Sequence, residues 1–164
     1  MLVVGIDPGT ARTGYGFVRE TDDGNLEVVN FGVIQTPAHQ SPQTRLLQIF
    51  QELKNLLLLY QPESAAVEKL FFQRNVTTAI AVGEARGVAL LALAERGLEV
   101  AEYTPLQIKQ AVVGYGGADK NQVQQMVRTL LGLAEIPRPD DAADALAVAI
   151  CHLHSRRINR LANI

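Results

Sequence analysis

The apolar run from Leu2 to Ile6, followed at once by Asp7-Pro8-Gly9, constrains the fold more than any other feature of the chain. A nearly continuous series of aliphatic and β-branched residues is typical of a strand that is buried on both faces. Proline and glycine then end the strand abruptly. We therefore expect a central strand with an acid, Asp7, at its carboxyl end.

The remaining patterns predict a mixed sheet covered by helices, in the order β-β-β-α-β-α-β-α-α-α. Turn-forming residues at 22–25 join the second and third strands. Ser41 is expected to cap the first helix with its hydroxyl, ahead of Pro42. The predicted strands are 2–7, 13–19, 26–34, 65–68 and 98–103, and the predicted helices are 42–60, 76–96, 105–112, 120–131 and 140–157.

Length and composition limit the kinds of protein that this chain can be. A chain of 164 residues with 48% hydrophobic content suits one α/β domain, residues 1–164. A net charge of −2 argues against a polybasic coat, although basic residues outnumber acids after residue 103. Cys151 is the only cysteine, which excludes an intramolecular disulfide. No uninterrupted apolar stretch approaches about 20 residues, so we expect a cytoplasmic protein without a membrane segment.

Four acids stand where apolar residues would be expected: Asp7, Glu68, Asp141 and Asp144. Asp7 and Glu68 end two predicted strands, and parallel neighbours would bring them out side by side at the carboxyl edge of the sheet. Asp141 and Asp144 are three residues apart, so they project from one face of the last helix. If that face covers the carboxyl edge, all four carboxylates converge.

Structural roles could explain some of these acids. Asp7 could cap the turn at residues 9–12, and acids near a helix start, such as Asp140 and Asp141, are favoured by capping and by the helix dipole. Asp144 lies a full turn inside an alanine-rich helix, where an unpaired buried carboxylate would cost several kcal/mol. Glu68 has no capping role. The acids therefore point to a function when taken together.

Clustered carboxylates repel one another unless divalent cations hold them ionised. An all-oxygen set without Cys or His favours Mg²⁺, with Mn²⁺ able to substitute. Two such ions about 4 Å apart can activate water on one side of a phosphodiester and stabilise the leaving oxygen on the other. The predicted chemistry is metal-assisted hydrolysis of a phosphodiester, with two ions per site.

Five segments of the chain resemble the RuvC-type Holliday-junction resolvases, in the family's order and nearly from end to end. They are residues 5–16 (GIDPGTARTGYG), 67–71 (VEKLF), 107–114 (QIKQAVVG), 119–128 (DKNQVQQMVR) and 140–150 (DDAADALAVAI). The resemblance implies a ribonuclease H-like fold with a five-stranded mixed sheet. It also implies a homodimer that cuts four-way DNA junctions with Mg²⁺ in recombination and repair, leaving 5′-phosphate and 3′-hydroxyl ends.

The resemblance also assigns roles to individual residues. It implies that Asp7, Glu68, Asp141 and Asp144 are the catalytic, metal-binding acids, and that Lys109 and Lys120 hold or neutralise the scissile phosphate. Phe71 would unstack bases at the junction, and Arg74 and Arg128 would contact backbone phosphates. Without the resemblance, Lys120 could merely start a helix and the arginines could belong to a solvated helix face.

The resemblance implies partners as well. The helix at 76–96 resembles the family's dimer-forming segment, although packing within one chain would explain its glycines equally well. A branch-migration motor complex is an expected partner of the family. Lys69 departs from the family, which commonly has Gln or Glu after the catalytic glutamate; on a strand Lys69 points away from the face of Glu68. Arg156, Arg157 and Arg160 fit DNA contact or a solvated face equally well.

Two other functions fit parts of the sequence. Sugar kinases and actin-like ATPases also open with an Asp-x-Gly-Thr phosphate loop, but a chain this short lacks the second domain that would enclose ATP. A junction-binding protein without catalysis would share the fold, but idle clustered carboxylates carry an electrostatic cost. The sequence therefore favours a structure-selective endonuclease.

Overall fold

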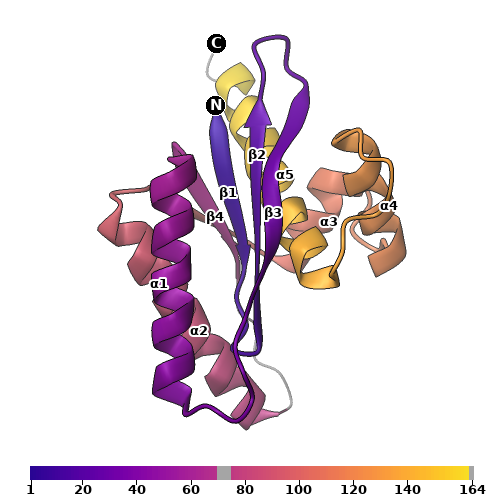
Figure 1. Ribbon diagram of the computed structural model, residues 1–164. Coiled ribbons are helices and arrows are strands. Elements are labelled where there is room, and N and C mark those ends of the chain that lie inside the picture. Colours follow the sequence, from indigo (N-terminus) through magenta and orange to yellow (C-terminus); the bar gives the residue numbers. More distant parts are fainter. Residues whose placement is uncertain (70–74, 163–164) are drawn as a thin grey trace.

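The computed structural model describes residues 1–69 and 75–162 and centres on a five-stranded mixed sheet (Figure 1). The strand order is β3-β2-β1-β4-β5, in which β1 pairs antiparallel with β2 and parallel with β4. The apolar first strand is therefore central, as its composition predicts. The strands are β1 (Leu2–Asp7), β2 (Arg12–Glu20), β3 (Leu26–Gln35), β4 (Ser64–Glu68) and β5 (Val100–Tyr103).

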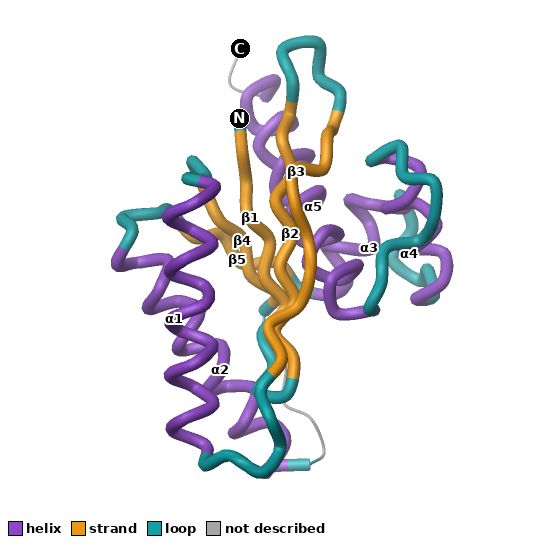
Figure 2. Tube along the Cα trace, viewed as in Figure 1, coloured by secondary structure: helices purple, strands orange, loops and turns teal. Residues whose placement is uncertain are grey.

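Helices cover both faces of this sheet, which confirms the predicted element order and fold class. Helices α1 and α2 lie on one side of the sheet, and α3, α4 and α5 lie on the other (Figures 1 and 2). The helices are α1 (Pro42–Tyr60), α2 (Val76–Glu95), α3 (Pro105–Val113), α4 (Lys120–Leu130) and α5 (Asp140–Ala162).

The alternation of side chains along β1 divides the core in two. Val4 and Ile6 pack with α1 and α2, whereas Val3 packs with α5 on the opposite face. Gly5 also faces α5, and a Cβ atom at this position would overlap the carbonyl oxygen of Ala145. The helix therefore lies directly against the strand. Asp7 follows Gly5 by two residues, so it shares the face that α5 covers.

Side chains cap the starts of α2, α3 and α4, but not the start of α1. Asp119 caps α4 in a reciprocal pair with Gln122, which sets Lys120 as the first helical residue. The predicted cap by Ser41 is wrong, because its side chain makes no capping bond to α1. The Ser41 hydroxyl instead pairs with the Thr44 hydroxyl at 2.8 Å. Thr104 caps α3 in the same reciprocal way as α4.

Helix α2 corrects one prediction drawn from composition. By length and composition alone, Val76–Glu95 is apolar enough to cross a membrane, contrary to the expectation that no segment of this chain is. Glu84 and Arg86 interrupt the apolar run but leave the helix apolar as a whole. Its buried face packs against α1 and the sheet, whereas much of its remaining surface is exposed, so the prediction of a tightly packed helix holds for one face only.

Candidate active site

Asp7 and Glu68 emerge beside each other at the carboxyl edge of the sheet. Strands β1 and β4 run parallel, and Ile6 is paired with Val67 immediately before the two acids. Each acid lies two residues after one that faces α5: Asp7 after Gly5, and Glu68 after Ala66. Side chains two residues apart on a strand point to the same face. The two carboxylates therefore leave neighbouring strands on the same face.

The first turns of α5 bring Asp141 and Asp144 to this edge. Gly14 pairs with Asp7 across β1 and β2, and a Cβ atom on Gly14 would overlap the carbonyl oxygen of Asp141. The absence of a side chain at Gly14 thus lets the start of α5 rest on the sheet. The negative charges of Glu68, Asp141 and Asp144 all raise the pKa of Asp7, as expected for four acids that lie near one another.

The capping roles considered for the acids are filled by other groups. Thr13 holds the turn after β1, because its Oγ1 donates to the Gly9 carbonyl at 2.7 Å and accepts from the Gly9 amide at 3.4 Å. Asp7 is therefore not needed for that turn. At the start of α5, the amides of Ala142 and Ala143 donate to the carbonyl of Pro139.

Asp140 also has a role other than the predicted helix cap. Its Oδ1 accepts hydrogen bonds from Arg138 at 2.8 Å and from Gln124 at 3.1 Å. Its Oδ2 lies 3.4 Å from the Nζ of Lys120. Asp140 therefore joins the end of the preceding loop and α4 to α5, because its carboxylate finds stronger donors than the free amides of its own helix.

Burial and mutual repulsion disfavour ionisation of the acids. Burial, with the charges of Asp144, Glu68 and Asp141, raises the pKa of Asp7 to about 8, against the opposing effect of Lys120. Burial also raises the pKa of Glu68 and of Asp144 above their ordinary values. Such a set gains the most from a bound cation, which would favour the ionised forms.

Two predicted lysines line a cavity with two of the acids. The cavity has a volume of about 200 Å³ and is bordered by Glu68, Lys109, Lys120 and Asp144. The Nζ of Lys120 donates to Oδ2 of Asp144 at 3.3 Å. Partial burial lowers the pKa of Lys120, but the attraction of Asp144 and Asp140 outweighs it and raises that pKa overall. The lysine is thus a cation held at the acids.

The donor chemistry of the site fits a hard divalent cation, because all four candidate ligands are carboxylates. Within residues 1–69 and 75–162, however, no group of three His, Cys, Asp or Glu side chains is close enough to hold a metal ion. Lys120 pairs with Asp144, and the NH1 of Arg12 lies 3.7 Å from Oδ2 of Asp141. These cations offset the repulsion that a metal would otherwise relieve.

The other predicted DNA contacts lie apart from the acids or outside the described residues. Phe71 and Arg74 fall outside the described residues. Arg128 is in the last turn of α4, and no contact in the described structure joins it to the acids. The C-terminal arginines lie at the opposite end of the sheet, where Arg160 contacts Met1 and Glu20. This position favours a solvated face over DNA contact at the active site.

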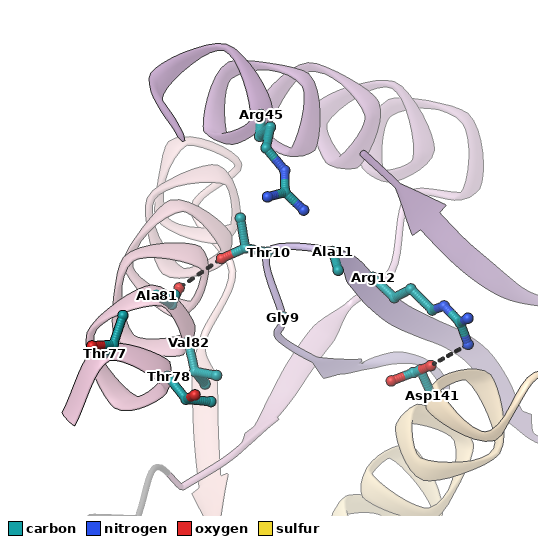
Figure 3. A pocket seen from close by; sticks show the side chains of 10 residues that line it. All are labelled: Gly9, Thr10, Ala11, Arg12, Arg45, Thr77, Thr78, Ala81, Val82 and Asp141. Carbon is teal, nitrogen blue, oxygen red and sulfur yellow. Dashed lines mark hydrogen bonds and ion pairs between the residues drawn. The ribbon is translucent and has the colours of Figure 1, made fainter. Parts of the chain in front are cut away.

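The structure also shows a feature that the sequence patterns did not reveal. A second cavity, of about 580 Å³, adjoins Asp141 and is bordered by Arg12 and Arg45 (Figure 3). The glycine-rich turn at 9–12 hinted at a phosphate-binding loop. No sequence pattern predicted that Arg45 lies beside this turn, because its position there depends on how α1 packs.

Comparisons with known proteins agree on one family. The family model of the crossover junction endodeoxyribonuclease RuvC matches residues 3–152. The RuvC of Syntrophomonas wolfei subsp. wolfei is 57% identical over 159 residues, which are 97% of this chain and 92% of the relative. The RuvC of Desulfitobacterium hafniense is 59% identical over 162 residues, or 98% of each chain.

Solved structures extend the similarity to the fold. Thermus thermophilus RuvC has a TM-score of 0.90 at 39% identity, covering 97% of each chain. The same protein in complex with a Holliday junction substrate has a TM-score of 0.88 at 37% identity, covering 96% of each chain. The yeast mitochondrial Holliday junction resolvase Ydc2, at 16% identity and a TM-score of 0.65, shares the fold over 94% of this chain and 80% of its own. This chain therefore belongs to the RuvC family of crossover junction endodeoxyribonucleases.

Proposed function

We propose that this protein resolves four-way DNA junctions by metal-assisted hydrolysis at Asp7, Glu68, Asp141 and Asp144. The observation that carries this assignment is the meeting of these four acids at one edge of the sheet, in a chain of the RuvC family. The likeness to a RuvC bound to a Holliday junction substrate supports the choice of DNA. Hydrolysis would leave 5′-phosphate and 3′-hydroxyl ends without a covalent enzyme intermediate.

The acids would share the binding of Mg²⁺, with two ions per site and Mn²⁺ as a substitute. When bound, the metal would supply an activated water and charge stabilisation at the phosphodiester. Asp7 would be the ligand common to the set, since the charges of the other three acids all act on its pKa. The raised pKa values of Asp7, Glu68 and Asp144 keep these three carboxyl groups protonated more readily than ordinary carboxylic acids, so metal binding would release protons.

Lys109 and Lys120 would bind the scissile phosphate. Both side chains border the cavity that holds Glu68 and Asp144, and Lys120 is already drawn to the acids through Asp144. If a metal took the place of Lys120 as the partner of Asp144, the ammonium group of Lys120 would be free to donate to a phosphate oxygen. It would then offset negative charge that develops as the bond breaks.

The protein would act as a homodimer through α2, because one junction offers two strands to be cut. Within the described residues, α2 leaves Val76 and Ile80 more than half exposed, at 69% and 57%. Gly87 faces open space, with nothing within 4 Å of a Cβ atom built there. An apolar, partly uncovered helix of this kind fits association between copies. We place the protein in the cytoplasm, with a branch-migration motor as its partner in recombination and repair.

The proposal is tested by cleavage of a synthetic mobile four-way junction with Mg²⁺. We expect Asp7→Asn and Glu68→Gln to bind the junction but to cut it at least roughly 10²-fold more slowly, because each removes a charged ligand. Asp22→Asn, in the exposed turn between β2 and β3, serves as the matched control and should cut like the wild type.

Robust cutting by either active-site variant would refute the assignment of the acids. A linear duplex of the same sequence tests the choice of substrate. Equal cutting of the duplex and the junction by the wild type would refute selectivity for four-way DNA. Junction binding without any cutting by the wild type would point to a non-catalytic relative.

A further inference from the structure

The cavity beside Asp141 is separate from the cavity that holds Lys109 and Lys120. Three segments that are distant in the sequence form its walls (Figure 3). They are the turn at 9–12 after β1, Arg45 in the first turn of α1, and the first turns of α2 with Thr77 and Thr78. We call this cavity the Arg45 pocket.

The guanidinium group of Arg45 is held in place by a hydrogen bond from its Nε atom. Its Nε donates to Oγ1 of Thr36 at 2.8 Å, and the Thr36 hydroxyl, on a residue that is only 7% exposed, donates to the carbonyl of Thr10 at 2.6 Å. Within the described part of the chain, its two Nη atoms make no hydrogen bond. Figure 3 shows the guanidinium extending towards the turn at 9–12. The pocket thus contains a positioned, half-buried cation with donors to spare.

The opposite wall is fixed to the same turn. The hydroxyl of Thr10 donates to the carbonyl of Ala81 in α2 at 2.9 Å (Figure 3). Asn75 caps α2 by accepting from the amides of Thr77 and Thr78, and these two residues line the pocket. Threonine residues from the first turn of α2 and from the turn at 9–12 therefore line the pocket together with Arg45.

Arg12 adds a second cation that is only loosely engaged. Its side chain is 52% exposed, and its NH1 lies 3.7 Å from Oδ2 of Asp141. A cation bound by Asp141 would weaken this pair, since both would compete for the same carboxylate. Arg12 would then be free to turn to a ligand in the pocket.

Two arginines with hydroxyl groups are suited to a phosphate, because guanidinium groups donate to its oxygens in a fork. We propose that the Arg45 pocket binds a backbone phosphate of the DNA strand being cut, next to the scissile phosphate. This inference rests on the proposed function of the acids. The pocket shares Asp141 with them, so a strand that lies across the acids brings a neighbouring phosphodiester to its mouth. Cations on both sides of the acids would then hold the strand in register.

The first experiment measures junction binding as a function of salt, by fluorescence anisotropy with Mg²⁺, every protein carrying Glu68→Gln so that the junction is bound but not cut. We expect Arg45→Ala and Arg12→Ala each to weaken binding roughly tenfold and to lower the slope of log K against log salt by about 1. The matched control is Arg19→Ala, an exposed arginine at the opposite end of β2 from Arg12. Arg12→Ala removes no buried contact, so it tests the pocket even if Arg45→Ala perturbs the fold.

The second experiment locates the phosphate. Single neutral methylphosphonates are placed along the cut strand, one position at a time. We expect one position near the cut to weaken binding by the wild type but not to weaken binding by Arg45→Ala any further, because the two changes remove the same contact. Additive losses at every position would overturn the proposal. So would slopes of Arg12→Ala and Arg45→Ala equal to that of Arg19→Ala.

A free phosphate is the other source of the same chemistry. Thermal unfolding with millimolar inorganic phosphate separates the two sources. Stabilisation of the wild type but not of Arg45→Ala, without any coupled methylphosphonate position, would assign the pocket to a free anion and overturn the proposal. If the wild type does not bind the junction at all, the proposed function fails; if it binds and only the coupling is absent, the pocket assignment alone fails.

Discussion

At the scale of single residues, the proposed active site contains three acids whose surroundings oppose ionisation: Asp7, Glu68 and Asp144. Asp7 is the extreme case, since burial and three neighbouring acids raise its pKa to about 8 from an ordinary value of 3.8. Local sequence placed Asp7 at a strand end but left open whether it capped a turn. Thr13 fills that role, so the carboxylate is free for chemistry.

The raised pKa of Asp7 predicts a pH dependence of stability in the metal-free protein. The unfolded chain ionises Asp7 near pH 4 while the folded protein keeps the proton until about pH 8, so stability is lost as the pH rises through this window. The Asp7→Asn variant has no carboxyl group to ionise at this position, so it should not lose stability in this way as the pH rises. We expect equal unfolding free energies near pH 4 and an Asp7→Asn variant that is more stable above pH 8, by up to about 5 kcal/mol.

Urea denaturation in EDTA across this pH range measures the difference. Asp22→Asn, at an exposed position, is the control and should follow the wild type at every pH. If Asp7→Asn also followed the wild type throughout, Asp7 would not be held protonated by its surroundings. Added Mg²⁺ should narrow the gap, because a cation would favour the ionised carboxylate.

At the scale of elements, the site depends on how closely α5 rests on β1 and β2. Glycines at the contact permit this approach: Gly5 faces Ala145, and Gly14 faces the backbone of Asp141. Alternation along the strands places these glycines on the same face as the acids. The contact that packs the helix therefore also sets the position of Asp141 and Asp144.

Gly14→Ala is expected to displace the start of α5. The added methyl group would overlap the backbone of Asp141, which is rigid, so overpacking should cost about 1–3 kcal/mol. Junction cleavage should fall more than junction binding, because the acids move while the lysines remain. Thermal unfolding and cleavage rates measure both effects.

Gly32→Ala is the matched control on the adjacent strand. A Cβ atom there would lie 2.7 Å from the hydroxyl of Tyr15, the far end of a side chain that can shift. We expect this variant to cut junctions at the rate of the wild type. Loss of cleavage in both variants alike would mean that the close contact of α5 has no special effect on the acids.

At the scale of the whole molecule, α2 presents an apolar surface that one chain does not cover. Leu91 is 59% exposed, and Gly87 has nothing within 4 Å of its side-chain position. The helix also forms a wall of the Arg45 pocket through Thr77 and Thr78. Dimer formation through α2 would therefore place a second copy close to the proposed path of the DNA.

If the protein forms the proposed dimer through α2, Gly87→Leu is expected to convert it to a monomer. A larger side chain at an exposed position should leave the fold of each chain intact but hold two α2 helices apart. Sedimentation velocity should show that the dissociation constant of the dimer rises roughly tenfold or more. Gln51→Leu, on the exposed side of α1, is the control and should leave the dimer unchanged; an unchanged dimer in Gly87→Leu would exclude close approach at this helix.

Local sequence patterns were enough to predict the elements and the central place of β1, and to single out the four acids as the proposed catalytic set. These features depend on local patterns: an unbroken apolar run, turn residues, helical spacing and acids at positions that favour apolar residues. The order of five sequence motifs also predicted that the chain belongs to the RuvC family. The cap expected of Ser41 failed because a neighbouring hydroxyl competed for it.

The surroundings of the acids, by contrast, depend on long-range packing. Arg12, Arg45 and Thr77 are distant in the sequence, and no local pattern indicates that β2, α1 and α2 meet around one cavity. Likewise, whether α2 was buried or exposed could not be read from its composition, because burial depends on which elements cover each face. Local physical chemistry selects the elements, whereas long-range packing selects which of their side chains face one another.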